Sequence, residues 1–268
     1  MRVENQPHEP VSEYAEFRPP AALADQFVCF WTQTIVGSKG RYEHRVLPDG
    51  CIDIVLINDQ EPIVVGPWTV PMLARFAVGT SITGARLRPG CAPCLVGIPA
   101  SELLNQAIPV ADVKGAAQSI RLEDAIEQPD AAVRRSMLAQ ALSALVAQRS
   151  PVDTAVMAGT RWLARHRHGR IEELSRWMGI SERQLHRRFS AAIGYGPKTF
   201  QSVLRFQRLL KTAREMDAEH SLADLAWNAG YADQAHMTRE VQRFAELRPT
   251  ALLRSAESAL QMSDLFKT

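Results

Sequence analysis

Several features that would place the chain in a familiar class are missing from its 268 residues. No run of about 18 consecutive apolar residues occurs, so we expect no membrane-spanning helix. The first residues, MRVENQPHEPVSEYAEF, are polar and acidic, which is unlike a signal peptide, and a cytoplasmic location follows. The N-terminal half has no spaced cluster of histidines and carboxylates, so we expect no metal site, no cofactor and no enzymatic activity.

Cysteine is scarce, with four residues that all lie in the first 94 positions, and in a cytosolic protein these thiols stay mostly reduced. Cys91 and Cys94 have the C-x-x-C spacing that can bind a soft metal or form a redox pair. Cys51 and His44 are further candidates for a thiol or effector site. There is no second C-x-x-C, so small buried hydrophobic side chains are the alternative interpretation.

Charge is unevenly distributed along a chain whose net charge is only +2. Residues 1–159 carry 13 Lys and Arg against 17 Asp and Glu, a net −4, whereas residues 160–254 carry 17 against 10, a net +7. Hydrophobic residues make up 46% of the chain, which is typical of a globular protein. The contrast predicts two parts with different partners, and the basic part favours an anionic one.

The region from about residue 23 to 98 predicts short β-strands. FVCFWTQTIV is aromatic and β-branched, and RYEHRVLPDGCIDIVLI indicates two strands around a turn at Pro48-Asp49-Gly50. Closely spaced short strands favour a small barrel or a sandwich. Ser101 is a plausible N-cap for a helix that follows.

Residues 119–127 and 131–148 predict two helices, the second capped by Asp130. The second helix places an apolar stripe on one face: Met137, Leu138, Ala141, Leu142 and Leu145. The stripe can pack on the β region or form a seam between two copies, and the sequence leaves both open. Residues 147–153 predict a linker.

From residue 155 onward the pattern is helical, and one unit occurs twice. IEELSRWMGISERQLHRRF aligns with LADLAWNAGYADQAHMTREV at an offset of 51, which becomes 52 after the turn. Gly179 matches Gly230 at the first offset, and Arg187 matches Arg239 at the second. A helix, a turn with glycine and a second helix is the form of a helix-turn-helix, whose second helix enters the major groove.

The periodicity separates an inward from an outward edge in each second helix. Leu185 and Phe189 face inward in the first unit, as do Met237, Val241 and Phe244 in the second. The outward sets match one to one at the offset of 52. Arginine can donate two hydrogen bonds to guanine, and a glutamine amide can form two with adenine, one donated and one accepted, so these edges suit base contacts.

The two units resemble the AraC/XylS family of transcriptional regulators. The resemblance covers about residues 155–255, with landmarks that include Gly196-Pro197, Gly230-Tyr231 and Pro249. It implies a helical DNA-binding domain in which one long helix holds two recognition helices, with RNA polymerase as a further partner. Carried over by position, the base-facing residues would be Arg183, His186, Arg187, Gln234, Thr238 and Arg239. Two departures are Val241, where the family usually has Phe, and Glu246, where it usually has Gly.

Contacts to DNA phosphates are predicted at the start of helices and at nearby cations. The candidates are Ser181, Lys198, Thr199 and Arg243, with Arg161, Arg165 and Arg205 as weaker ones. Trp162 and Trp177 are predicted to fill core or seam positions. In the front half, LPDGC and GARLRPGCAPC resemble a subgroup of the same family with a sensor domain, which implies a small-molecule effector of unknown identity.

The sequence therefore predicts an α+β protein with three parts. These are a β-barrel or sandwich-like sensor domain at 1–115, a helical linker with possible homodimer contacts at 116–153, and a DNA-binding domain with two helix-turn-helix motifs at 154–268. The predicted function is a sequence-specific, effector-modulated transcriptional regulator of double-stranded DNA, and an activator rather than a repressor. The alternatives are a regulator that responds to thiol chemistry or a soft metal, or a cysteine-dependent DNA repair enzyme.

Overall fold

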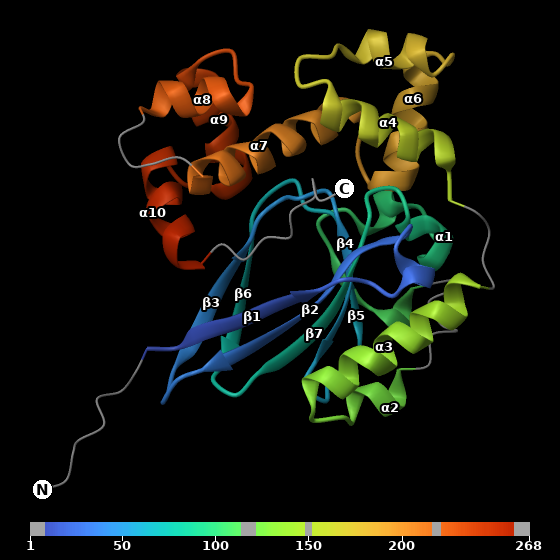
Figure 1. Ribbon diagram of the computed structural model, residues 1–268, viewed down its shortest axis with the longest axis vertical. Coiled ribbons are helices and arrows are strands. Elements are labelled where there is room, and N and C mark those ends of the chain that lie inside the picture. The colour runs from blue at the N-terminus through green and yellow to red at the C-terminus, as the bar shows by residue number, and fades with distance from the viewer. Residues whose placement is uncertain (1–8, 114–121, 148–151, 216–220, 260–268) are drawn as a thin grey trace, which may run out of the picture.

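The computed structural model describes residues 9–113, 122–147, 152–215 and 221–259. An antiparallel β domain with helices on one flank, which we call the front domain (9–147), is followed by a helical domain (152–259) lying across one end of the sheet (Figure 1). This arrangement confirms the predicted α+β class. The boundaries predicted at 115 and 153 stay a prediction.

The front domain contains a six-stranded sheet and a separate two-stranded ribbon. The sheet has the order β1-β2-β7-β4-β5-β8 and the ribbon pairs β3 with β6, and all of these neighbouring strands are antiparallel. Among the described residues the strands form two hydrogen-bonded sheets, so the sandwich-like form of the prediction fits. The strands are β1 Val11–Phe17, β2 Phe27–Val36, β3 Arg41–Val46, β4 Ile52–Ile57, β5 Ile63–Val65, β6 Met72–Ala77, β7 Ser81–Leu87 and β8 Ala107–Pro109.

The front domain also contains six helices in its described residues, most of them short, and two local features differ from expectation. Ser101 lies inside a 3-10 helix that follows Pro99 and caps nothing, because no side-chain cap bond is present there. Cys91-x-x-Cys94 lies at the start of an unexpected helix, where Pro93 occupies the first turn. The helices are η1 Ala21–Leu23, α1 Ala92–Val96, η2 Ala100–Leu103, η3 Val110–Asp112, α2 Glu123–Ile126 and α3 Ala131–Val146.

Helix α3 packs on the sheet by its apolar stripe. Asp130 caps it as predicted, since its carboxylate accepts hydrogen bonds from the amides of Ala132 and Val133 at 2.7 and 3.0 Å. Leu138 and Leu142 are fully buried, and the helix contacts β2 and β7. The stripe therefore belongs to the core of the front domain, which is the first of the two alternatives, and these leucines are not exposed for a seam between copies.

The helical domain follows the predicted segments within a few residues. Its helices are α4 Thr154–Arg165, α5 Ile171–Trp177, α6 Glu182–Ile193, α7 Pro197–Glu215, α8 Leu222–Ala229, α9 Gln234–Ala245 and α10 Pro249–Ala259. The sequence predicts helices at Lys198–Met216 and Ala251–Leu260, and the last residue of each lies outside the described residues. The inward residues Leu185, Phe189 and Met237 are all fully buried in one core. In the part of the chain that is described, no helix is both long and apolar enough to cross a membrane.

Candidate nucleic-acid interface and effector cavity

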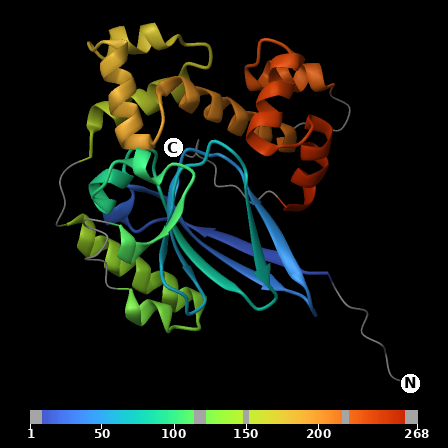
Figure 2. The ribbon, with the colours of Figure 1, turned by 180° about the vertical axis from the view of Figure 1, so that it is seen from behind.

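Helices α6 and α9 form the candidate DNA-binding surface. Viewed from behind, both helices lie on the near side of the long helix α7 (Figure 2). The turns that precede them contain Gly179 and Gly230, whose φ angles of +65° and +90° are readily adopted only by glycine. Two helix-turn-helix units thus present their second helices on one side of the domain.

The first recognition helix, α6, is capped and exposes a cationic edge. The Ser181 hydroxyl accepts a hydrogen bond from the Gln184 amide at 3.2 Å, and the Gln184 side chain accepts one from the Ser181 amide at 3.1 Å. This reciprocal capping satisfies two amides at the start of the helix. Arg183, His186 and Arg187 are exposed, which confirms that they face outward.

His186 is less independent than its neighbours. A Cβ atom added to Gly196 would lie 2.5 Å from His186 Nε2, so the imidazole rests against the backbone that opens α7. Its Nδ1 lies 3.4 Å from the Ser190 hydroxyl. Glycine at 196 therefore keeps the space that this side chain occupies.

The second recognition helix, α9, repeats the arrangement. The Asp233 carboxylate accepts a hydrogen bond from the His236 amide at 2.6 Å and caps the helix. Gln234, Thr238 and Arg239 are exposed. The Thr238 hydroxyl donates to the Gln234 carbonyl at 2.9 Å, so this hydroxyl hydrogen is already engaged.

The predicted phosphate contacts lie at or near the same surface elements. Ser181 and Lys198 are exposed and Thr199 is half-buried. Arg243 is exposed and lies 5.0 Å from the ring centre of Phe244. Arg205 departs from its weaker prediction, because it is buried and turned away from solvent.

A buried ion pair fixes the second recognition helix to α7. Arg205 Nη2 lies 2.8 Å from Glu240 Oε1, and Arg205 Nε donates to Oε2 at 3.1 Å. Burial raises the pKa of Glu240, but the hydrogen bonds and charge of Arg205 outweigh burial and hold the pKa below its usual value. Sequence reasoning missed this role. The signal was an acidic residue next to the inward position Val241 in an otherwise cationic helix.

A second ion pair fixes the first recognition helix. Arg188 Nη2 lies 2.6 and 2.8 Å from the two carboxylate oxygens of Asp153, which also caps α4 by accepting from two backbone amides. Arg188 thus links α6 to the start of the helical domain. Each of the two helices is thus fixed to a neighbouring element by an arginine–carboxylate pair.

The turn between β3 and β4 joins the two domains. Its Pro48 carbonyl accepts a hydrogen bond from Gln207 Nε2 on α7 at 2.6 Å. Gly50 adopts φ +84°, and a Cβ atom there would lie 2.9 Å from Phe200. Leu47 is buried in the core of the helical domain. The front domain therefore contacts α7 directly, the long helix that joins the two helix-turn-helix units.

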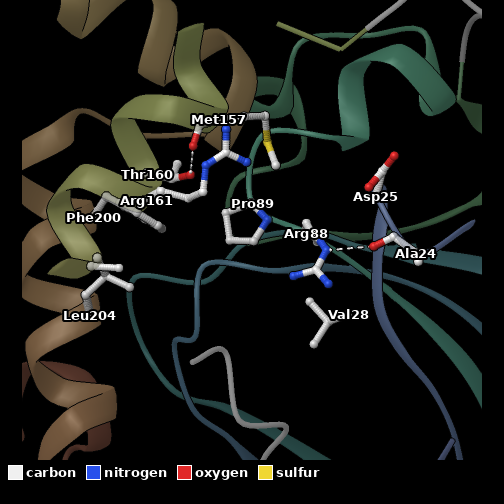
Figure 3. A pocket seen from close by; sticks show the side chains of 11 residues that line it. Ala24, Asp25, Val28, Arg88, Pro89, Met157, Thr160, Arg161, Phe200 and Leu204 are labelled. Atoms are coloured by element: carbon white, nitrogen blue, oxygen red, sulfur yellow. Dashed lines mark hydrogen bonds between the residues drawn. The ribbon is translucent and has the colours of Figure 1, made fainter. Parts of the chain in front are cut away.

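A hollow of about 240 Å³ lies beside this contact, between the two domains. Figure 3 shows Met157, Thr160 and Arg161 of α4 opposite Arg88 and Pro89 of the front domain. The Arg88 guanidinium donates to the Ala24 carbonyl at 3.0 Å. The domains thus meet closely at the β3–β4 turn and less closely at this hollow.

A cavity of about 280 Å³ lies between the β3–β6 ribbon and the main sheet. Its walls are mostly aliphatic and aromatic, with Arg86 and Asp53 as the charged groups. Arg86 Nη2 lies 2.9 Å from Asp53 Oδ2, and Arg86 Nη1 lies 3.6 Å from Asp49 in the β3–β4 turn. His44, a candidate for an effector site, lines the cavity, and burial together with Arg86 lowers its pKa to about 4, which keeps the ring neutral.

A family described as a helix-turn-helix domain matches residues 174–255, from within α5 into α10. The chain therefore carries a DNA-binding domain of the kind that the AraC/XylS resemblance predicts, which makes it a DNA-binding regulator. Residues 15–109 of the regulator match a family described as a domain of unknown function (DUF6597). No curated protein matches the sequence.

Solved structures similar to the regulator include several of ToxT from Vibrio cholerae. ToxT of strain O395 has a TM-score of 0.44 at 9% identity, over 91% of this chain and 97% of ToxT. ToxT bound to (E)-4-(8-methylnaphthalen-1-yl)but-3-enoic acid scores 0.44 at 8% identity, over 82% and 99%. ToxT bound to an unsaturated fatty acid scores 0.42 at 11% identity, over 98% and 100%. Likeness of this degree carries no information on what the regulator binds.

The front domain also reaches the first recognition helix of the regulator. Pro99 and Ser101 line a surface hollow together with Arg183, His186 and Arg187. Helix η2 contacts α6, and a Cβ atom at Gly194 would lie 3.1 Å from the Ala100 carbonyl oxygen. The front domain therefore borders the predicted base-facing edge of α6.

Trp162 and Trp177 of the regulator lie in different surroundings. Trp162 is partly buried and stacks on His166 with ring centres 4.2 Å apart, in keeping with its predicted place. Trp177 was predicted to fill a core or seam position, and this was wrong in the described chain because 56% of it is exposed. Glu246 ends α9 with φ +55°, which explains why glycine is usual at this position.

The cysteines give little support to thiol chemistry in the regulator. Burial raises the pKa of Cys91 to about 12 and also raises the pKa values of Cys51 and Cys94. A thiolate is the reactive and metal-binding form, so these groups are poor nucleophiles and ligands. Within the described residues no group of three His, Cys, Asp or Glu side chains could hold a metal ion. The packing interpretation of these cysteines is the one that the geometry favours.

Proposed function

We propose that the regulator binds a specific duplex by placing α6 and α9 in successive major-groove segments. The observation that carries this proposal is the exposed polar edge on both helices, on one side of α7, while their apolar edges lie in one core. Arg183, His186 and Arg187 face the bases in the first segment, and Gln234, Thr238 and Arg239 do so in the second. Duplex geometry places such segments about one turn, ~34 Å, apart.

Phosphate contacts would orient the helices on the duplex. The capped start of α6 at Ser181 and the start of α7 at Lys198 and Thr199 offer backbone amides and a cation to phosphate oxygens. Arg243 adds a cation in the last turn of α9. These contacts carry no sequence information, but they make binding strongly dependent on salt.

The front domain would modulate this binding in response to a small effector in the cavity between the β3–β6 ribbon and the main sheet. The supporting observation is its direct contact with α7 and α6 through the β3–β4 turn and η2. We place the regulator in the cytoplasm, as an activator that acts through RNA polymerase, without enzymatic activity of its own. A homodimer stays a prediction, and its surface would lie outside the buried stripe of α3.

The test uses a duplex selected from a random library by binding to the full-length chain. Arg187→Ala and Arg239→Ala should each weaken binding by about 1–3 kcal/mol, or roughly 5- to 150-fold, and relax the preference at a few base positions. Arg41→Ala is the matched control, because Arg41 is an exposed arginine on β3 in the front domain. Fluorescence anisotropy at several salt concentrations gives the dissociation constants. Affinity and base preference that survive both substitutions would contradict the proposed function.

A further inference from the structure

The cavity beneath the β3–β6 ribbon contains little hydrogen-bonding capacity that a ligand can use. Its apolar walls include Trp31, Val55, Met72 and Phe76. The Tyr14 hydroxyl donates to Glu16 at 2.8 Å, and the Gln33 side chain donates to Ser12 at 2.8 Å. These two polar side chains of the wall are thus occupied by neighbours within β1.

The two charged side chains of the wall, Arg86 and Asp53, are hydrogen-bonded to each other. Arg86 Nε donates to both Asp53 oxygens at 3.0 and 3.3 Å, and Nη2 donates to Oδ2 at 2.9 Å. An anionic ligand would have to take Arg86 from Asp53 and leave a carboxylate buried without its partner. A cationic ligand would meet the reverse problem with Asp53. Breaking a buried pair by removing one partner is strongly unfavourable, so the cavity selects against either charge.

Two buried polar atoms of wall residues have no hydrogen-bond partner, an indole donor and a ring nitrogen of a neutral histidine. Trp31 Nε1 and His44 Nδ1 are buried without a hydrogen-bond partner. His44 faces the charge of Arg86 and stacks beside Tyr42, with ring centres 6.2 Å apart, and it stays uncharged. A ligand with one carbonyl or hydroxyl group needs no more hydrogen bonds than this wall can offer, whereas a strongly polar ligand would leave some of its polar groups without a partner.

We propose that the cavity binds an uncharged, largely apolar molecule of about one or two rings with at most one or two hydrogen-bonding groups. The inference rests on the proposed function, in which this cavity is the effector site. It goes further by naming the chemical class of the ligand. The volume of about 280 Å³ lies near the lower end of small-molecule sites, which begin at about 300 Å³.

The test compares three probes of one size on the full-length chain at neutral pH: acetophenone, benzoate and benzylammonium. Ligand-observed NMR and the thermal unfolding midpoint report binding. Acetophenone should bind and raise the midpoint with concentration, whereas benzoate and benzylammonium should bind at least tenfold more weakly. Absence of acetophenone binding, or equal or tighter binding of either ion, overturns the proposal.

Two variants on one strand locate the binding. Ala74 lines the cavity and Ala77 is exposed on the same strand, so Ala74→Phe should abolish acetophenone binding while Ala77→Phe should preserve it. Ala74→Leu, a smaller change, should weaken binding and guards against misfolding of the larger variant. Equal loss in both Phe variants, or no loss in either, refutes the cavity as the site. Binding of the selected duplex is measured separately, so failure of the DNA-binding function is distinguishable from failure of this ligand class.

Discussion

The ion pair between Arg205 and Glu240 allows a quantitative prediction, because both side chains are only 11% exposed and two N–O contacts join them at 2.8 and 3.1 Å. Arg205→Met or Glu240→Leu alone leaves one buried charge without its partner. Each single variant should lower the free energy of unfolding by about 3–5 kcal/mol. The double variant replaces both charges with apolar groups and should recover all or nearly all of that loss.

The pH dependence of this stabilisation has a definite sign. The pKa of Glu240 is held below its usual value in the folded state, chiefly by Arg205 acting against burial. The contribution is therefore fully present above the unfolded pKa, about 4.3, and is lost as the pH falls through the lower folded pKa. Urea unfolding between pH 7 and pH 3 should show this loss in the wild type and not in the double variant.

The control and the functional readout follow from the location of the pair. Lys211 and Glu215 on the surface of α7 lie 4.0 Å apart with 42% and 65% exposure, so Lys211→Met should cost less than about 1 kcal/mol. Because the Arg205–Glu240 pair joins α7 to α9 and not to α6, single variants should lose affinity at the base pairs read by α9. The reasoning is refuted if single variants cost less than about 1 kcal/mol, or if the double variant is as unstable as they are.

Two further predictions concern α9 and the cysteines. Glu246→Gly should raise the free energy of unfolding by about 1 kcal/mol, because Glu246 adopts φ +55°. Glu246→Ala keeps that strain and should give no such gain in urea unfolding, and an equal gain from both variants would contradict the argument. Cys91, whose pKa burial raises to about 12, should resist iodoacetamide at pH 8 in the folded chain and react fully in denaturant. Rapid labelling of folded protein, followed by mass spectrometry, would instead favour thiol sensing.

The helical domain could be predicted closely because its signals are local. A period of 3.6 residues, serine or aspartate caps and turn glycines predicted the bounds of α8 and α9 within one residue and those of α6 within three residues. The same periodicity predicted the exposure of Arg183 and Arg239. The repeat supplied a second, independent copy of each signal, which is why the outward edges of the two units agree.

The front domain was harder to predict because its features depend on pairing between distant strands. Strand β1 was missed, since VSEYAEF has few strongly hydrophobic residues and is an edge strand that pairs with β2 alone. Helix α1 was missed because it has only five residues, contains Pro93 in its first turn and ends at Gly97. No local pattern marks the cavity, which exists only where the ribbon β3–β6 covers the sheet.

Asp49 shows what the sequence could and could not reveal about communication between the domains. Its place in Pro48-Asp49-Gly50 predicted a turn, and the turn is present. The structure adds that Arg86, a wall residue of the cavity, lies 3.6 Å from Asp49, and that burial raises the pKa of this carboxyl. The neighbouring Pro48 carbonyl accepts the hydrogen bond from Gln207 on α7.

Cavity wall, turn and α7 thus form one continuous set of contacts. A ligand that shifts Arg86 would change the ion pair between Arg86 and Asp49 in the β3–β4 turn. A shift of this turn would in turn strain the contact of Gly50 with Phe200 and the hydrogen bond between Pro48 and Gln207. Helix α7 is joined to α9 by the ion pair between Arg205 and Glu240. The backbone at its start, at Gly196, packs against His186 of α6. The energy available for coupling equals the difference in ligand affinity between the two arrangements, so along this route an uncharged ligand would act on DNA binding only insofar as it favours one position of Arg86.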